Sequence, residues 1–282
     1  MPLTTSGAML LSAQAGAYAV GAFNIENMEM AQAVIEAAQE LNSPVILQTT
    51  PSTLRYAPCE VYCGIVKALA ENAAVPIALH LDHGDSLNLC AKALQAGYTS
   101  IMIDGSKLAL EENISLTRQV ADMCITYGVQ TEGELGQVGG KEDDTVTENA
   151  GYTIPAEALR FEKETGLFSM AVGVGTAHGF YAAPPVLNLE LISELKRNIS
   201  VPMVLHGASG LSDETVRECI RRGICKVNFA TELRAAYTEG VKQVLREKPD
   251  TYDPKAYGKA GRERVKEFVK ERILVCGCAG KG

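Results

Sequence analysis

The histidines of this sequence lie where predicted strands end. The chain has four, His80, His83, His178 and His206, and each follows a short apolar run rich in β-branched residues, the pattern of a buried strand. Imidazoles from three separate strands can share one borderline-soft ion such as zinc and leave positions open for water or substrate. A structural zinc site would need four closed ligands, usually thiolates, which these segments do not offer. The pattern therefore predicts a catalytic metal site.

Carboxylates accompany the histidines at the same predicted strand ends. In the third strand, alternation places His80 and Asp82 on one face and leaves His83 at the tip, so Asp82 and His83 can reach one cavity. Asp104 ends the fourth strand and Glu134 the fifth. An unpaired carboxylate would be costly at the end of an apolar strand, so we expect each to have a cationic partner.

Two turns made of small residues suggest a phosphate site. Gly207-Ala208-Ser209-Gly210 precedes the seventh predicted helix, and Asn228-Phe229-Ala230-Thr231 precedes the eighth. Backbone N–H groups and the positive dipole end at the start of a helix attract anions. Small residues also form ordinary helix caps, so each turn alone is a weak signal. Next to a histidine cluster, the two turns together predict a phosphorylated ligand.

The elements that must position these residues alternate regularly along the chain. Strands are predicted at residues 18–24, 44–48, 76–82, 100–104, 129–134, 168–174, 202–206 and 226–228. Helices are predicted at residues 28–41, 60–71, 85–96, 110–127, 156–165, 189–197, 213–222 and 232–247, with a further one at 254–272. Apolar strands alternating with helices form parallel α/β sheets, and eight such units favour a closed (β/α)8 TIM barrel over an open sheet. We expect a single barrel domain over residues 1–282, with an additional C-terminal helix.

One connection of this barrel is unusually long. Residues 136–153 are rich in glycine and charge, and long connections in compact domains are often functional. We therefore expect a lid there. Its acidic run, Lys141-Glu142-Asp143-Asp144, would by itself be interpreted as a solvated loop.

Composition excludes several classes of function. The formal net charge is −8, and acidic and basic residues are mixed along the chain, so no basic patch can neutralise nucleic-acid or lipid phosphates. The sequence contains neither a leader-like start nor an apolar window of about 18 residues, which indicates a cytoplasmic protein without a membrane partner. Its eight cysteines lack CxxC spacing, which indicates buried, reduced thiols.

Further motifs occur in a fixed order from residue 16 to residue 232. They are residues 16–24, His80-Leu81-Asp82-His83, Ile103-Asp104-Gly105-Ser106, Glu132-Gly133-Glu134-Leu135-Gly136, residues 139–144, Thr176-Ala177-His178-Gly179, Leu205-His206-Gly207-Ala208-Ser209 and residues 226–232. In this order they resemble the class II, metal-dependent ketose-bisphosphate aldolases. The resemblance covers nearly the whole chain.

The resemblance implies a role for each motif. The catalytic zinc ion would be bound by His83, His178 and His206. Asp82 would exchange a proton with the aldehyde oxygen, and Glu142 would be the loop base that moves the triose-phosphate proton. Some relatives place a second divalent or monovalent cation where Asp104 and Glu134 lie. Dihydroxyacetone phosphate would be held by Gly179, Gly207, Ala208, Ser209, Asn228, Phe229, Ala230 and Thr231.

The residue types agree with this chemistry. As a carboxylate, Asp82 can take the C4 hydroxyl proton while the C3–C4 bond breaks and electrons flow toward a C2 carbonyl polarised by the metal. The products are dihydroxyacetone phosphate and glyceraldehyde 3-phosphate. No Schiff-base lysine is then needed, and Lys226, predicted at the start of the eighth strand, lies at the wrong end for one.

Three details bear on the substrate and on assembly. Many relatives carry a lysine soon after Tyr181, whereas residues 182–185 read Ala-Ala-Pro-Pro, which removes one family contact to phosphate. Ala208, Ala230 and residues 50–53 resemble the tagatose-bisphosphate branch more than the fructose branch. The predicted helix at 254–272 suggests a homodimer or homotetramer, in which Lys259 and Arg262 would bring a cation to the far phosphate of the sugar substrate.

Two alternatives remain open at this point. A zinc hydrolase on a barrel would be favoured by a His-x-His pair that ends the first strand, but residues 23–26 read Phe-Asn-Ile-Glu. A non-catalytic phosphosugar-binding protein would explain the phosphate turns but leave three histidines without a role.

Overall fold

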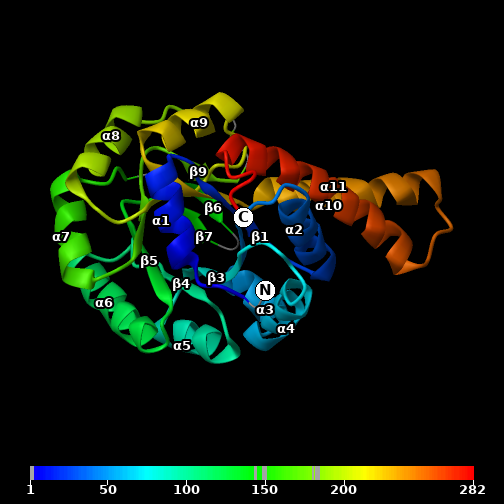
Figure 1. Ribbon diagram of the computed structural model, residues 1–282, viewed down its shortest axis with the longest axis horizontal. Coiled ribbons are helices and arrows are strands. Elements are labelled where there is room, and N and C mark those ends of the chain that lie inside the picture. The colour runs from blue at the N-terminus through cyan, green and yellow to red at the C-terminus, as the bar shows by residue number, and fades with distance from the viewer. Residues whose placement is uncertain (1–2, 143–144, 148–150, 180, 182–184) are drawn as a thin grey trace.

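A closed barrel of parallel strands forms the centre of the molecule (Figure 1). The computed structural model describes residues 3–142, 145–147, 151–179, 181 and 185–282. In spatial order around the barrel, the eight strands of this described part are β1 (Val20–Asn24), β11 (Ile224–Phe229), β10 (Met203–Leu205), β8 (Ser169–Val172), β5 (Gln130–Leu135), β4 (Ser100–Ile103), β3 (Ile77–Gly84) and β2 (Val45–Thr49). The predicted (β/α)8 barrel is confirmed.

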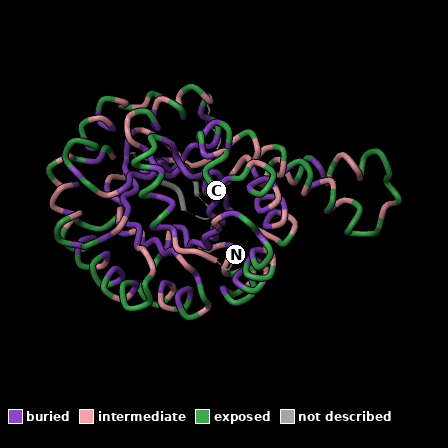
Figure 2. The backbone as a smooth tube through the Cα atoms, viewed as in Figure 1, coloured by how far each residue is buried: buried purple, intermediate pink, exposed green. Residues whose placement is uncertain are grey.

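Helices surround the barrel and cover its apolar outer surface. They are α2 (Met28–Glu40), α4 (Cys59–Ala70), α5 (Leu87–Ala96), α6 (Leu110–Thr126), α7 (Pro155–Thr165), α8 (Leu189–Asn198), α9 (Asp213–Arg222) and α10 (Thr231–Glu247). Side-chain caps define several starts, because Asn27, Ser86 and Ser212 accept hydrogen bonds from backbone N–H groups of α2, α5 and α9. Figure 2 shows the strands and the inward helix faces buried. The predicted helix positions agree with these bounds to within a few residues.

An N-terminal helix that the sequence analysis missed closes one end of the barrel. This helix, α1 (Ser6–Gly16), contacts the first residues of two barrel strands. Its Ser6 Oγ donates to Ser100 Oγ at 2.9 Å, and the backbone N–H of Gly7 donates to Gln130 Oε1 at 3.2 Å. Parallel strands all start at one end, so α1 covers the amino-terminal end of the barrel and leaves the carboxyl-terminal end for ligands.

The long connection after β5 contains strands instead of forming only a loop. β6 (Gly139–Glu142) pairs with β7 (Thr145–Thr147) and with β9 (Ala177–His178) in a small sheet. Gly140 lies opposite His178 with φ +86°, and a Cβ there would lie 2.3 Å from the His178 carbonyl oxygen. A glycine is therefore required where β6 packs against the His178 segment. A short helix, α3 (Pro51–Tyr56), was also not predicted.

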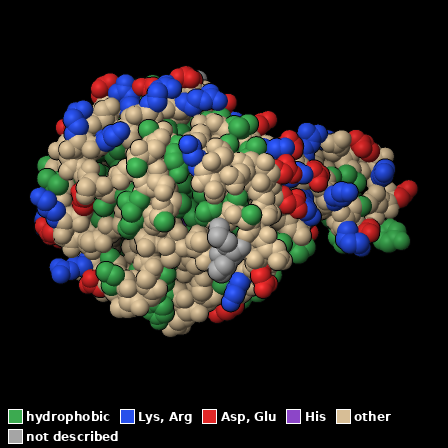
Figure 3. All heavy atoms as spheres, viewed as in Figure 1, with side chains coloured by type: hydrophobic (Ala, Val, Ile, Leu, Met, Phe, Trp, Pro, Cys, Tyr) green, Lys and Arg blue, Asp and Glu red, His purple; other side chains and the backbone are tan. Residues whose placement is uncertain are grey.

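The additional C-terminal helix is present and extends away from the barrel. It is α11 (Pro254–Cys276), which forms a helical arm with α10 (Figure 1). Figure 3 shows basic and acidic side chains interspersed on this arm. Nearer the barrel, Arg262 forms an ion pair with Glu36 of α2 and donates to Gln32 at 3.2 Å. Arg262 is thus engaged within its own chain.

Two further expectations can be compared with the described residues. All eight cysteines are buried and free, which confirms the prediction made from their spacing. No helix in the described part of the chain combines the length and apolarity needed to cross a membrane.

Candidate metal centre

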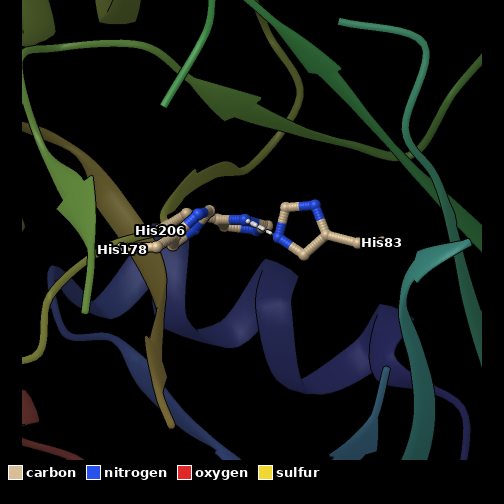
Figure 4. A group of neighbouring side chains, drawn as sticks. All are labelled: His83, His178 and His206. Atoms are coloured by element: carbon tan, nitrogen blue, oxygen red, sulfur yellow. Dashed lines mark hydrogen bonds between the residues drawn. The ribbon is translucent and has the colours of Figure 1, made fainter. Parts of the chain in front are cut away.

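Three histidine side chains converge at the carboxyl-terminal end of the barrel (Figure 4). His83 comes from β3, His178 from β9, and His206 directly follows β10. One ring nitrogen from each lies within 4.8 Å of the others, and the His83 and His206 ring centroids are 4.7 Å apart. The structure therefore brings together the three histidines that the sequence analysis grouped.

The backbone at the end of β3 turns His83 into this cluster. His83 has φ +49°, a left-handed conformation that is uncommon for a non-glycine residue and often occurs at functional sites. The register between β3 and β4 shifts between Leu81 and Gly84. A Cβ at Gly84 would lie 2.5 Å from the Met102 carbonyl oxygen, so glycine permits the close approach after the turn.

Carboxylates hold the outer nitrogens of two of these rings. His83 Nδ1 lies 2.9 Å from Asp104 Oδ2, and His206 Nε2 lies 2.9 Å from Glu132 Oε1. Burial opposes ionisation of Asp104, but its hydrogen bond to His83 and the charge of that ring bring its pKa well below the usual range. Burial likewise opposes ionisation of Glu132, but the Lys226 charge and the His206 hydrogen bond bring its pKa well below the usual range. Both carboxylates therefore accept hydrogen bonds.

The remaining nitrogens of His83 and His206 fit a cation. His83 Nε2 and His206 Nδ1 face each other at 2.9 Å. Burial lowers the pKa of His206, which favours its neutral form. When both rings are neutral and each uses its N–H toward a carboxylate, the two facing nitrogens present lone pairs, and a proton or a metal ion between them relieves the repulsion. This donor set suits a divalent ion bound by imidazoles.

A second group of metal-binding atoms lies next to the first. His83, Asp104 and Glu134 bring ligand atoms within 4.8 Å of one another. Glu134 Oε2 lies 3.8 Å from His83 Nδ1 and 3.6 Å from His206 Nδ1. Asp104 directly follows β4 and Glu134 is the last residue but one of β5, so neither ends its strand as predicted. Both carboxylates approach His83 Nδ1, Asp104 at 2.9 Å and Glu134 at 3.8 Å.

Amide side chains hold Asp82 at the edge of the histidine cluster. Its carboxylate accepts hydrogen bonds from Asn24 at 2.9 Å, Gln48 at 3.1 Å and Asn228 at 3.1 Å, and its Oδ1 lies 4.0 Å from His83 Nε2. Asp82 is buried. Asn24 and Gln48 were not predicted as site residues, although an amide near the end of an otherwise apolar strand was an available signal. Three strands besides β3 thus contribute to the position of Asp82.

A pocket beside this network contains most of the predicted phosphate residues. It is lined by Asn24, His178, Gly179, Gly207, Ser209, Asn228, Ala230, Thr231 and Arg234. Ala230 precedes α10 and provides no side-chain cap, so the backbone N–H groups of Thr231 and Glu232 at the start of the helix can bind an anion. Tyr181 joins two lining segments, because its hydroxyl accepts from Ala177 N at 2.8 Å and donates to Gly207 O at 2.7 Å.

Two predicted phosphate residues do not line this pocket. Phe229 stacks on Phe23 at a centroid distance of 5.5 Å, because alternation along β11 turns Asn228 into the barrel and Phe229 out of it. Ala208 packs in the hydrophobic core. Arg234, whose Nε donates to Glu26 Oε1 at 2.7 Å, lines the pocket but was not predicted. Its position one turn after Thr231 on α10 was the available signal.

Two residues lie deeper in the barrel than predicted. His80 is the fourth residue of β3 and is fully buried, not at the end of the strand. Lys226 is the third residue of β11 and is also buried, because β11 begins before the predicted start. The Lys226 ammonium contacts Glu132 Oε2 at 2.9 Å. It is therefore part of an interior ion pair.

Some predictions concern parts of the chain that are not described. Glu142 belongs to β6, but its side chain lies outside the described part. Residues 182–184, where many relatives have a lysine, also lie outside it.

The chain belongs to the class II fructose-bisphosphate aldolase family. The family model "Fructose-bisphosphate aldolase class-II" matches residues 4–281. The confirmed resemblance makes this chain an aldolase, a carbon–carbon lyase. Membership in this family leaves no support for the hydrolase and non-catalytic alternatives.

Solved structures agree with this assignment. The YdjI aldolase from Escherichia coli K12 is 35% identical, with a TM-score of 0.89 and 99% of each chain covered. A protein from Coccidioides immitis, provisionally named a fructose-1,6-biphosphate aldolase, is 29% identical with a TM-score of 0.90, covering 97% of this chain and 96% of that one. Fructose-bisphosphate aldolase from Campylobacter jejuni, at 23% identity, shares the fold with a TM-score of 0.84, covering 100% of this chain and 97% of that one.

Proposed function

We propose that this chain catalyses zinc-dependent, reversible aldol cleavage of tagatose or fructose 1,6-bisphosphate to dihydroxyacetone phosphate and glyceraldehyde 3-phosphate. The observation that carries the proposal is the position of Asp82. Its Oδ1 lies 4.0 Å from His83 Nε2, and two of its hydrogen-bond donors, Asn24 and Asn228, also line the pocket. A proton acceptor is thus placed between a histidine cluster and a pocket suited to phosphate.

The zinc ion would be held by His83, His178 and His206. When bound, it supplies Lewis-acid polarisation of the ketose carbonyl. Asp82 accepts the C4 hydroxyl proton during cleavage and returns a proton during synthesis. Its amide donors keep the carboxylate from rotating away from the reacting oxygen. We assign proton transfer on the triose phosphate to Glu142.

The pocket would bind the phosphate of the triose half. Gly207 and Gly210 have φ of +64° and +85°, left-handed conformations that glycine adopts without strain in this turn. Backbone N–H groups of this turn and of the start of α10 would donate to phosphate oxygens. Oδ1 of Asn228 has no hydrogen-bond partner among the described residues. It can therefore accept from a substrate hydroxyl.

We further propose a second divalent or monovalent cation at Asp104 and Glu134. These two carboxylates and His83 form a group of suitable size. Asp104 also accepts a hydrogen bond from His83 Nδ1. A cation bound to Asp104 would compete for that contact and change how His83 is held for the three-histidine site.

We also infer that the enzyme works in the cytoplasm on a small phosphorylated sugar, as a homodimer or homotetramer. Eight buried thiols agree with a reducing compartment. The projecting α10–α11 arm offers a surface through which copies of the chain could associate (Figure 1).

The test combines metal removal with three substitutions. Chelation with EDTA should abolish cleavage, and added zinc should restore it. His83→Ala, His178→Ala and His206→Ala should each abolish turnover and reduce bound zinc, while circular dichroism shows a folded barrel. Zinc at wild-type stoichiometry in one of these variants would remove that residue from the ligand set. Purified wild-type protein that binds no zinc would refute the proposal.

A further inference from the structure

A chain of buried polar side chains runs through the barrel from α1 to His206. Its contacts join Ser6 Oγ to Ser100 Oγ at 2.9 Å, Ser100 Oγ to His80 Nδ1 at 2.7 Å, His80 Nε2 to Lys226 Nζ at 3.4 Å, Lys226 Nζ to Glu132 Oε2 at 2.9 Å, and Glu132 Oε1 to His206 Nε2 at 2.9 Å. None of these residues is more than 3% exposed. The barrel interior is therefore partly polar in this protein.

Such a chain needs a physical reason. Barrel interiors are usually filled with layers of branched apolar side chains. Desolvating an ion pair such as Lys226–Glu132 costs free energy that the pair recovers only with good geometry and further hydrogen bonds. The proposed reaction uses neither Lys226 nor His80. Their role must lie in what they impose on their neighbours.

Lys226 determines the direction of the hydrogen bonds on both sides of it. A lysine ammonium only donates, so His80 Nε2 and Glu132 Oε2 must both accept. His80 therefore carries its proton on Nδ1 and donates it to Ser100. Glu132 remains an acceptor, and its other oxygen receives the N–H of His206 Nε2. The Nδ1 atom of His206 then faces His83 with its lone pair.

We propose that Lys226 is a positioning residue for the metal centre, which acts through Glu132 to keep the proton of His206 on Nε2 and its Nδ1 available to a metal ion. The proposal rests on the proposed zinc function. It concerns residues that do not touch the substrate. Groups of this kind, one shell beyond the ligands, typically change metal affinity by about 10–100-fold when mutated.

Glu132→Gln provides the sharpest test. In this variant Lys226 still donates, so the amide oxygen of the substituted side chain turns to Lys226 and its NH2 group faces His206 Nε2. His206 must then accept at Nε2 and carry its proton on Nδ1, the atom that the metal needs. We expect zinc affinity, measured by competition with a chromophoric chelator, to fall about 10–100-fold.

The double variant Lys226→Met/Glu132→Gln separates positioning from packing. Without Lys226 the amide can rotate and present its oxygen to His206, so zinc affinity should recover at least several-fold relative to Glu132→Gln alone. A purely structural role predicts that the second substitution adds to the damage. The double variant also removes both charges, so it avoids leaving one buried charge unpaired.

A readout without metal distinguishes this proposal from the zinc function. Two-bond ¹H–¹⁵N spectra of the four histidines in metal-free protein report which ring nitrogen carries the proton. We expect His206 protonated on Nε2 in the wild type, unprotonated there in Glu132→Gln, and mixed in the double variant. If Glu132→Gln does not fold, the double variant still tests the proposal, because we expect His206 in that variant to carry its proton partly on Nε2 and partly on Nδ1. If the wild type binds no zinc, the zinc function fails and these spectra still decide the role of Lys226.

Thr49→Val serves as the matched control. Thr49 is fully buried in β2 and its hydroxyl bonds to the Tyr98 hydroxyl at 2.8 Å, outside the chain of contacts from Ser6 to His206. Its loss should lower the melting temperature without changing the His206 spectrum or zinc affinity. An unchanged His206 spectrum in Glu132→Gln, or a double variant that binds zinc no better than Glu132→Gln, would overturn the proposal.

Discussion

Individual side chains in this site are positioned by hydrogen-bond partners from neighbouring strands. Asp82 is held by three amides from three strands, and His83 by a carboxylate that follows a fourth. Proton transfer requires the acceptor within hydrogen-bond reach of the proton it takes, so small displacements are costly. The amides are therefore as much a part of the proposed proton-transfer site as the carboxylate.

Asp82→Asn should keep the site intact and remove the reaction. The asparagine is isosteric and can still meet part of the amide network, but it cannot accept the C4 hydroxyl proton. We expect zinc and phosphate binding to be retained and kcat to fall by about 10²–10⁴-fold. Steady-state kinetics and zinc content of the same preparation measure both. A kcat near that of the wild type would reject this role for Asp82.

Asp104 should make the metal-free protein sensitive to acid. Its pKa is below the usual range in the folded state, so its ionised form stabilises the fold above the unfolded pKa of about 3.9. That contribution is lost as the pH falls from about 4 toward the folded pKa. Urea unfolding of Asp104→Asn should show a weaker loss of stability below pH 4 than the wild type. Parallel pH profiles of the two proteins would contradict this.

At the scale of helices and strands, local patterns predicted the barrel. They also predicted that His83, His178 and His206 lie at its carboxyl-terminal end. Apolar runs between capped helices fix where each strand lies, and alternation fixes where Asp82 points. The same patterns could not reveal that Lys226 and Glu132 pair inside the barrel, because that contact joins residues 94 positions apart. Helix α1 was missed because its small, mostly apolar residues show no clear helical stripe. The β6–β9 pairing likewise depends on a distant partner.

Strand β6 pairs with the His178 segment, and a substitution at Gly140 tests whether this pairing positions His178. Gly140→Ala would place a Cβ 2.3 Å from the His178 carbonyl oxygen at φ +86°. We expect β9 to shift and zinc affinity to fall at least tenfold, since His178 is one of the three proposed ligands. Gly128→Ala is the matched control, because Gly128 has φ +67° and nothing within 4 Å of its Cβ position. It should cost about 1–2 kcal/mol of stability and leave zinc binding unchanged.

The connections after the barrel strands should also determine the sugar epimer. Tagatose and fructose 1,6-bisphosphate differ only at C4, so discrimination amounts to about 1–3 kcal/mol in the barrier. The expected tagatose preference rests on the resemblance of Ala208, Ala230 and residues 50–53 to that branch, and of these Ala230 lines the pocket. We predict cleavage of both sugars, with kcat/KM for tagatose 1,6-bisphosphate at least equal to that for the fructose epimer. Side-by-side assays that trap the triose phosphates measure this, and a strong fructose preference would reverse it.

The whole molecule consists of a barrel closed at one end and an arm that projects from its side (Figure 1). Helix α1 covers the amino-terminal end and the histidines lie at the carboxyl-terminal end, so we expect substrate to enter there. The arm has little contact with the barrel at its tip, and Tyr252 there is 93% exposed. We expect this extended, exposed arm to contact another subunit.

We expect copies of the chain to associate through the arm. Light scattering should show a dimer or tetramer, and replacing Tyr252 with a charged residue should weaken association without unfolding the barrel.

Substitutions at Lys259 and Arg262 distinguish binding of the far phosphate from stabilisation of the chain by α11. Lys259 is exposed, so Lys259→Ala should raise KM for the bisphosphate if it reaches the far phosphate of a neighbouring subunit's substrate. Arg262 pairs with Glu36 of its own chain, so Arg262→Ala should lower the melting temperature and leave KM unchanged. A monomer at working concentration would defeat the interface, and a KM effect confined to Arg262→Ala would exchange the two assignments.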